Sequence, residues 1–185
     1  MTLIYNVIGP GDSNAGLNSA SSLRYGIQLN GATGLLVGRD ISVFKPSLMK
    51  TGAPAGNVTA TVRRASDDAI VASFNEVIDS TTLGASFAPV TFSLTTPYTL
   101  QDGDRILVEY GGNTGILIEI FTTDQFNGTL TRRTRFQTAA YSEAAATDIV
   151  ATIDDGVVAR GSFPTGRAFG GRLMNNAFAY PTFGA

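Results

Sequence analysis

Apolar and polar residues alternate along most of this chain, from about Leu23 to Ile153. An alternation with a period of two places successive side chains on opposite faces of an extended strand, so that one face can be buried while the other meets water. Gly, Asn, Asp and Pro, the usual turn residues, interrupt the alternation repeatedly. The pattern therefore predicts an all-β fold built from many short strands.

The alternating segments predict about nine or ten strands, the number expected of a two-sheet sandwich. Pro46 is expected to end one strand, and Asp67-Asp68 to form the turn of a hairpin. The exception is Ala139 to Ala146, which we expect to form a short helical turn. The predicted strands are Leu3–Ile8, Leu23–Leu29, Leu35–Val43, Val58–Val62, Ile70–Phe74, Val90–Leu94, Ile106–Tyr110, Ile116–Phe121, Leu130–Phe136 and Ile149–Ile153.

The segment Ile116–Phe121 is apolar on both faces, because three isoleucines on one side are opposed by Leu117, Glu119 and Phe121 on the other. A strand with this pattern is usually covered on both faces, so we predict that it is central in its sheet or covered by a neighbouring element. Together with the strand count, this predicts a two-sheet antiparallel β-sandwich of jelly-roll type with extended N- and C-terminal arms.

The composition divides the chain into three parts. Residues 1–22 are predicted to form an N-terminal arm, because a Gly9-Pro10-Gly11-Asp12 breaker is followed by a polar stretch. Residues 23–155 contain the regular alternation and are predicted to form the sandwich domain. Residues 156–185 lack that alternation and are predicted to form a C-terminal arm.

The 185 residues include 13 basic and 15 acidic ones, which gives a formal net charge of −2. So small a net charge provides no field that would attract nucleic acid or an anionic membrane surface, and we expect no nucleic-acid partner. The longest apolar run, residues 115–121, is far too short to span a bilayer. Residues 1–16 have no basic region ahead of an apolar one, so no signal peptide is predicted.

The chain contains no His and no Cys, which excludes Ser-His and Cys-His nucleophiles and Cys-based zinc sites. A Ser-Lys pair would need Lys45 or Lys50, both beside predicted turns. Glycoside hydrolysis needs only two carboxylates, and Glu109 and Glu119 could face each other on adjacent strands. The alternation favours exposed strand charges instead. We therefore predict no enzyme activity, no cofactor and no metal.

Two kinds of charged cluster have more than one interpretation. Asp67-Asp68, Asp102-Gly103-Asp104 and Asp154-Asp155 offer carboxylates that suit calcium, but Asp and Gly are also turn residues, and none has the spacing of a full calcium loop. Thr131–Arg135 is the densest basic run, with Arg133 and Arg135 on one face of the predicted strand. It is expected to be a solvated or interface surface rather than a phosphate site.

Five segments together show a resemblance to a known group of proteins: Ser42–Lys45, Gly52–Val62, Ile70–Ser73, Val90–Phe92 and Leu100–Tyr110. Together they resemble jelly-roll, carbohydrate-binding-like β-sandwich modules of microbial surface proteins and phage virion proteins. The resemblance covers roughly residues 23 to 153 and implies a sandwich fold with a glycan as a candidate ligand. The Trp that usually lies on the ligand face of such modules has no counterpart, because the chain contains no Trp.

Residues 156–185 combine aromatic residues with arginines in a Gly-rich stretch that has no acidic residue. Aromatic side chains are costly to leave in water, and a neighbouring subunit is a natural place to bury them. The segment could also pack on its own sandwich. The predicted assembly contacts are Phe163, Arg167, Phe169, Arg172, Phe178, Tyr180 and Phe183.

These observations predict a structural assembly protein of a virion or of a surface particle or filament, of the capsid-decoration or tail-associated type. Its expected partners are further copies of the chain or other structural proteins of the same particle, and its expected location is the virion or an extracellular particle. The alternative is a glycan-binding or adhesion module of a surface protein. That alternative requires exposed aromatic side chains, for which the candidates are Tyr25, Tyr98, Tyr110 and Tyr141.

Overall fold

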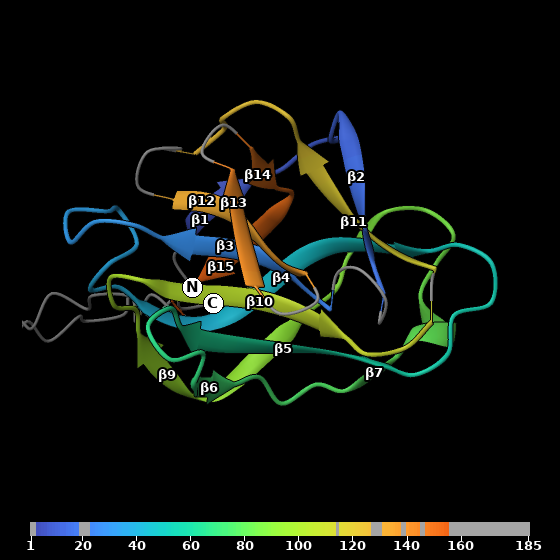
Figure 1. Ribbon diagram of the computed structural model, residues 1–185, viewed down its shortest axis with the longest axis horizontal. Coiled ribbons are helices and arrows are strands. Elements are labelled where there is room, and N and C mark those ends of the chain that lie inside the picture. The colour runs from blue at the N-terminus through green and yellow to red at the C-terminus, as the bar shows by residue number, and fades with distance from the viewer. Residues whose placement is uncertain are drawn as a thin grey trace, which may run out of the picture.

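The computed structural model describes residues 3–18, 23–113, 115–126, 131–137, 140–144 and 147–155. Within these ranges two antiparallel sheets pack against each other as a β-sandwich (Figure 1), so the predicted all-β sandwich is confirmed. The only helical element there is a short 3-10 helix, η1 (Ser80–Thr82), and no helix in this part of the chain is long and apolar enough to cross a membrane. Residues 156–185 lie outside the described ranges.

The first sheet contains eight strands. They are β1 (Leu3–Val7), β2 (Ser13–Leu17), β4 (Asp40–Lys50), β8 (Ala88–Pro89), β9 (Phe92–Thr99), β11 (Ile116–Phe121), β14 (Asp148–Ile149) and β15 (Ala151–Asp154). The long strand β4 pairs with β9 and then β8 along one edge, and with β15 and then β11 along the other. β2 pairs with β11, and the two strands lie together at the upper right of Figure 1.

The second sheet contains seven strands in the order β13-β12-β3-β10-β5-β6, with β7 also on β5. They are β3 (Arg24–Leu29), β5 (Asn57–Arg64), β6 (Ile70–Ser73), β7 (Ile78–Asp79), β10 (Asp104–Tyr110), β12 (Thr131–Gln137) and β13 (Ala140–Ala144). The β5–β6 hairpin is the one predicted across Asp67-Asp68, and Asp68 adopts a φ of 57° in its turn.

The core lies between the sheets and is built from alternate residues of their strands. In β10, Ile106 and Val108 are fully buried, opposite the buried Val62 and Ala60 of β5. Large apolar side chains of β4 and β11 fill the same core from the first sheet. As predicted, β11 is a central strand, because β2 pairs with one of its edges while β4 and β14 pair with the other.

The N-terminal segment differs from the predicted extended arm. β1 pairs with β15, and β2 pairs with β11, so residues 3–17 supply two strands of the first sheet. Tyr5 and Leu17 are fully buried in the core. The short apolar segments on either side of the Gly-Pro-Gly breaker are thus strands joined by a turn.

The prediction of a strand over Leu35–Val43 that ends before Pro46 is wrong. Residues 31–39 form turns, and β4 continues through Pro46 as far as Lys50. The Pro46 carbonyl accepts a hydrogen bond of 2.9 Å from the N–H of Val90, which lies between β8 and β9. The nitrogen of Pro46 faces the same edge of β4, where neither β8 nor β9 pairs with it, so proline is tolerated at this position.

Two further predictions near the C-terminal end of the sandwich are wrong. Residues 140–144 of the predicted helical turn form β13, because they pair with β12 and place Tyr141 opposite Phe136. Ile149–Ile153 is two strands rather than one, because Val150 leaves the ladder between β14 and β15. The described part of the chain contains fifteen strands, more than the nine or ten expected, since several are only two residues long.

Candidate functional site

The candidate site lies on the outer face of the first sheet, at the point where the neighbouring strands β4 and β11 diverge from each other. They pair only from Leu48 opposite Ile118 to Lys50 opposite Ile116. Beyond that point Val150 lies between the two strands, and the Val150 N–H donates a hydrogen bond of 3.0 Å to the Glu119 carbonyl. Its own carbonyl accepts from the Ser47 N–H at 2.8 Å.

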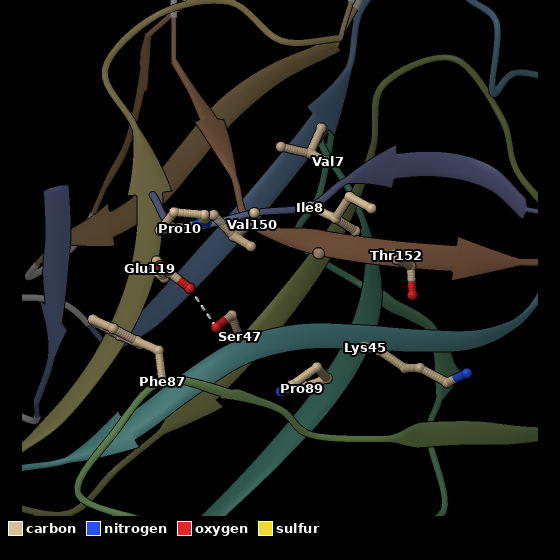
Figure 2. Close-up of a pocket in the computed structure, with 12 residues that line it drawn as sticks. Val7, Ile8, Pro10, Lys45, Ser47, Phe87, Pro89, Glu119, Val150 and Thr152 are labelled. Carbon is tan, nitrogen blue, oxygen red and sulfur yellow. Dashed lines mark hydrogen bonds between the residues drawn. The ribbon is translucent and has the colours of Figure 1, made fainter. Parts of the chain in front are cut away.

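The carboxylate of Glu119 connects the segments that meet at this junction, because it accepts hydrogen bonds from two of them. It is 8% exposed, and its Oε2 accepts a hydrogen bond of 2.5 Å from Ser47 Oγ (Figure 2). Its Oε1 accepts one of 2.7 Å from the Gly11 N–H. Gly11 has no room for a side chain, since a Cβ there would lie 2.5 Å from the Ile120 carbonyl oxygen. Glu119 therefore fixes the turn between β1 and β2 against the sheet.

An apolar groove of about 530 Å³ lies over this junction. The β1–β2 turn contributes one wall with Ile8 and Pro10, and the loop at β8 contributes the other with Phe87 and Pro89 (Figure 2). Val150 lies between these walls. A groove of this kind can bind apolar side chains, because binding removes their apolar area from water and the walls of the groove orient them.

Two charged side chains border the groove. Glu119 is held by the two hydrogen bonds described above, and Lys45 forms an ion pair of 3.4 Å with Asp154 while remaining partly exposed. An apolar surface with a cation at its rim suits an aromatic segment better than a hydrophilic one, because an aromatic face attracts a nearby ammonium group.

A charged cluster covers the outer face of the second sheet. Glu109 forms ion pairs with Arg63 at 2.7 Å and with Arg24 at 3.5 Å. Arg24 also contacts Asp68 at 2.7 Å, and Tyr141 donates to the same carboxylate at 2.7 Å. The cluster joins β3, β5, β10, β13 and the β5–β6 turn, so it connects most of this sheet.

The pKa values of two groups reflect this cluster. Partial burial alone raises the pKa of Asp68, but hydrogen bonds from Tyr141 and Arg24 outweigh it and hold that pKa below its usual value. Burial, followed by the hydrogen bond to Asp68, raises the pKa of Tyr141 to about 12. Tyr141 is therefore a neutral donor and Asp68 an ionised acceptor at neutral pH.

The structure does not bring the candidate catalytic carboxylates together. Glu109 lies on the second sheet and Glu119 on the first, each on the outer face. The expectation that they are exposed strand charges is also wrong, because both are largely covered and hydrogen-bonded. The candidate lysines are engaged elsewhere: Lys45 contacts Asp154, and Lys50 Nζ donates to the Thr81 carbonyl.

The acidic clusters have protein partners. Asp67 contacts Arg64 at 3.4 Å, and Asp102 accepts a hydrogen bond of 2.6 Å from the Gly31 N–H. Asp104 is buried and accepts one of 2.8 Å from the Gln101 N–H. Over the described ranges, no group of three or more acidic, His or Cys residues is arranged to hold a metal ion.

The four tyrosines proposed as a glycan platform do not form one. Tyr25 and Tyr110 are each 1% exposed and belong to the core. Tyr141 packs against Phe136 on the outer face of the second sheet, with ring centroids 4.9 Å apart. Tyr98 is partly buried at the end of β9.

All the predicted assembly contacts, Phe163, Arg167, Phe169, Arg172, Phe178, Tyr180 and Phe183, lie outside the described residues. The groove itself was missed by the sequence analysis. One signal was available: Glu119 interrupts an otherwise apolar run in a central strand, and a charge there needs a partner. No family model, curated protein or solved structure significantly matches this chain.

Proposed function

We propose that this chain is a structural assembly protein, and that the aromatic C-terminal segment of one copy docks in the apolar groove of a neighbouring copy. The observation that carries the proposal is the groove itself. Ile8 on its rim is 65% exposed, and Phe87 and Pro89 face it from the opposite wall. Surfaces of this kind mark protein interaction sites, because apolar side chains gain free energy when a partner covers them.

The C-terminal segment has the chemistry that the groove suits. Residues 156–185 contain Phe163, Phe169, Phe178, Tyr180 and Phe183. They follow β15 with only Asp155 between, and Ala151 and Thr152 of β15 line the groove. An extended chain spans roughly 3.3–3.6 Å per residue, so a segment of this length can reach a second copy.

Charge favours docking between copies. Residues 156–185 hold three arginines and no acidic residue, so the rest of the chain carries −5 when the chain as a whole carries −2. A positive segment is attracted to the negative body of another copy, which steers association and weakens with salt.

The strand order supports a jelly-roll sandwich as the assembly unit. β2, β11, β4 and β9 are neighbours in the first sheet, and β3, β10, β5 and β6 in the second. Consecutive strands from β2 to β5 alternate between the sheets, as in two interleaved Greek keys. Jelly rolls are common in viral capsid proteins, and we propose the virion or a surface particle as the place of assembly.

Truncation after Asp155 tests the proposal. The truncated chain is expected to be a folded monomer with a nearly unchanged melting temperature, whereas the full chain forms oligomers in analytical ultracentrifugation and rings or filaments in electron micrographs. Unfolding of the truncated chain would instead assign the aromatic residues to its own core.

A matched pair of full-length variants tests the groove. Ile8→Lys places a charge on the groove rim and is expected to abolish oligomers. Val77→Lys is the control, because Val77 is 60% exposed and is not one of the residues that line the groove. If both variants assemble equally well, the groove is not the docking site.

A further inference from the structure

A second pocket, of about 450 Å³, lies where the two sheets meet along β2 and β12. This volume is within the roughly 300–1,000 Å³ of small-molecule sites. No lining residue is shared with the apolar groove. The pocket is lined by Ser13, Asn14, Ala15, Gly16, Asn18, Tyr25, Ile120, Thr122, Arg133, Arg135 and Gln137.

Two arginines occupy core-facing positions in this pocket. Arg133 pairs with Ile27 and Arg135 with Tyr25 across the β3–β12 ladder. Residues directly opposite each other in an antiparallel pair share a sheet face, and both partners on β3 are buried in the core. β12 therefore presents guanidinium groups on the face where the other strands present apolar side chains. Both arginines are partly exposed at this end of the sandwich, and Arg135 Nε donates a hydrogen bond of 3.1 Å to Ser142 Oγ.

The hydroxyl of Tyr25 is a second, independent feature of the same pocket. Tyr25 is 1% exposed, and no described residue forms a hydrogen bond of good geometry with its hydroxyl, although the Arg133 guanidinium lies nearby, 5.7 Å from the centre of the Tyr25 ring. Buried hydroxyls normally have a partner, because water is lost on burial and must be replaced. Burial raises the pKa of Tyr25, so the hydroxyl keeps its proton and can donate.

The remaining lining residues are uncharged, and all but Ala15, Gly16 and Ile120 are polar. Amides come from Asn14, Asn18 and Gln137, and hydroxyls from Ser13 and Thr122, so the lining holds two cations and no carboxylate. The adjacent carboxylate of Asp12 accepts hydrogen bonds from the N–H and the hydroxyl of Thr122, at 2.7 and 2.8 Å.

We propose that this pocket binds a small organic anion, a carboxylate or a phosphate ester, whose oxygens pair with Arg133 and Arg135 and accept a hydrogen bond from Tyr25. Guanidinium groups match the oxygens of these anions in pairs of parallel hydrogen bonds. The amides and hydroxyls around them suit a ligand that carries further hydroxyl groups. The proposal is independent of assembly through the groove.

Isothermal titration calorimetry on the full-length chain tests the proposal with glucuronate, glucose 6-phosphate and inorganic phosphate, and with glucose as the uncharged control. The charged sugars are expected to bind saturably and glucose is not. Preference for glucuronate identifies a carboxylate ligand, and preference for glucose 6-phosphate a phosphate ester. Absence of saturable binding by every charged probe overturns the proposal.

Three variants locate the site. Tyr25→Phe keeps the ring and is expected to weaken binding by roughly fivefold, the value of one hydrogen bond. Arg135→Gln is expected to weaken it by more than roughly tenfold. Arg39→Gln, an exposed arginine outside the pocket lining, is the control and should bind like the wild type. Equal losses of affinity in all three variants would indicate nonspecific electrostatic attraction and overturn the proposal. If Arg135→Gln does not fold, the comparison of Tyr25→Phe with the wild type tests the site instead.

Discussion

Ser47 Oγ donates a hydrogen bond of 2.5 Å to Glu119 Oε2, and this bond joins β4 to β11 where the two strands separate. The same carboxylate holds the Gly11 N–H at 2.7 Å and so positions the β1–β2 turn. Because that turn carries Ile8 and Pro10, a buried polar contact determines the shape of the apolar groove.

Replacement of Glu119 by Ala is expected to lower the free energy of unfolding by about 1–3 kcal/mol, because it leaves the Gly11 N–H and the Ser47 hydroxyl without their acceptor. Ser47→Ala should cost less, since the carboxylate then keeps its hydrogen bond to Gly11. Urea denaturation of both single variants and the double variant measures the coupling. Fully additive effects would contradict a direct interaction.

Gly26→Ala is expected to destabilise the sandwich by about 1–3 kcal/mol or more, as overpacking does. A Cβ at Gly26 would lie 1.9 Å from the Ile106 carbonyl oxygen, so β3 and β10 would have to move apart. Gly16→Ala is the control, because the nearest atom to a Cβ there is 3.9 Å away. Thermal unfolding should show a lower melting temperature for Gly26→Ala alone; equal melting temperatures would contradict the close approach.

Glu109→Gln is expected to cost about 1–2 kcal/mol, because Arg24 and Arg63 would keep their charges at a partly buried site without this carboxylate. Their side chains are only 18% and 11% exposed. Arg64→Gln removes an ion pair whose partners are 54% and 51% exposed, and should change stability by less than about 0.5 kcal/mol. Chemical denaturation of the two variants distinguishes these values, and a neutral Glu109→Gln would show that the charged cluster does not stabilise the sheet.

Asp148→Asn is expected to gain stability relative to the wild type as the pH rises. Burial raises the pKa of Asp148, although hydrogen bonds from the Gln125 and Phe126 N–H groups oppose this. A carboxyl whose pKa is higher in the folded protein than the value of about 3.9 in the unfolded chain stabilises folding below that value. It loses this contribution as the pH rises through its folded pKa.

An Asn at position 148 does not titrate, and its amide oxygen can accept the bonds from Gln125 and Phe126, which are 2.6 and 2.8 Å long in the wild type. The difference in the free energy of unfolding between Asp148→Asn and the wild type should therefore be larger at about pH 7 than at about pH 3. Urea unfolding at both pH values measures it. A constant or shrinking difference would contradict the raised pKa.

The period-two alternation determined the fold class and most of the core. Ile106, Val108 and Tyr110 alternate in the sequence and are buried together, and the Asp67-Asp68 turn forms its hairpin. These features depend on neighbouring residues alone, because side-chain direction in a strand follows position along it. The same rule correctly placed Arg133 and Arg135 on one face.

Strand pairing between distant segments was decided only by the tertiary structure. Pro46 lies within β4 because its missing N–H meets a gap between β8 and β9, and residues 140–144 form a strand because β12 provides an edge for them. The local sequence does not determine which strand edge will be available for a segment to pair with, because strand formation depends on tertiary context.

The candidate sites were also decided only by the tertiary structure. The groove exists because Glu119, Ser47 and Gly11 meet from three segments, the last 108 residues away from Glu119 in the chain. The anion pocket likewise needs β12 to pack beside β3 so that Arg135 lies next to Tyr25. The sequence by itself determined which face each side chain occupies, through the local geometry of the strand. Which faces meet, and what they enclose, was decided by long-range packing, because hydrogen bonds and apolar burial between distant segments form only in the folded chain.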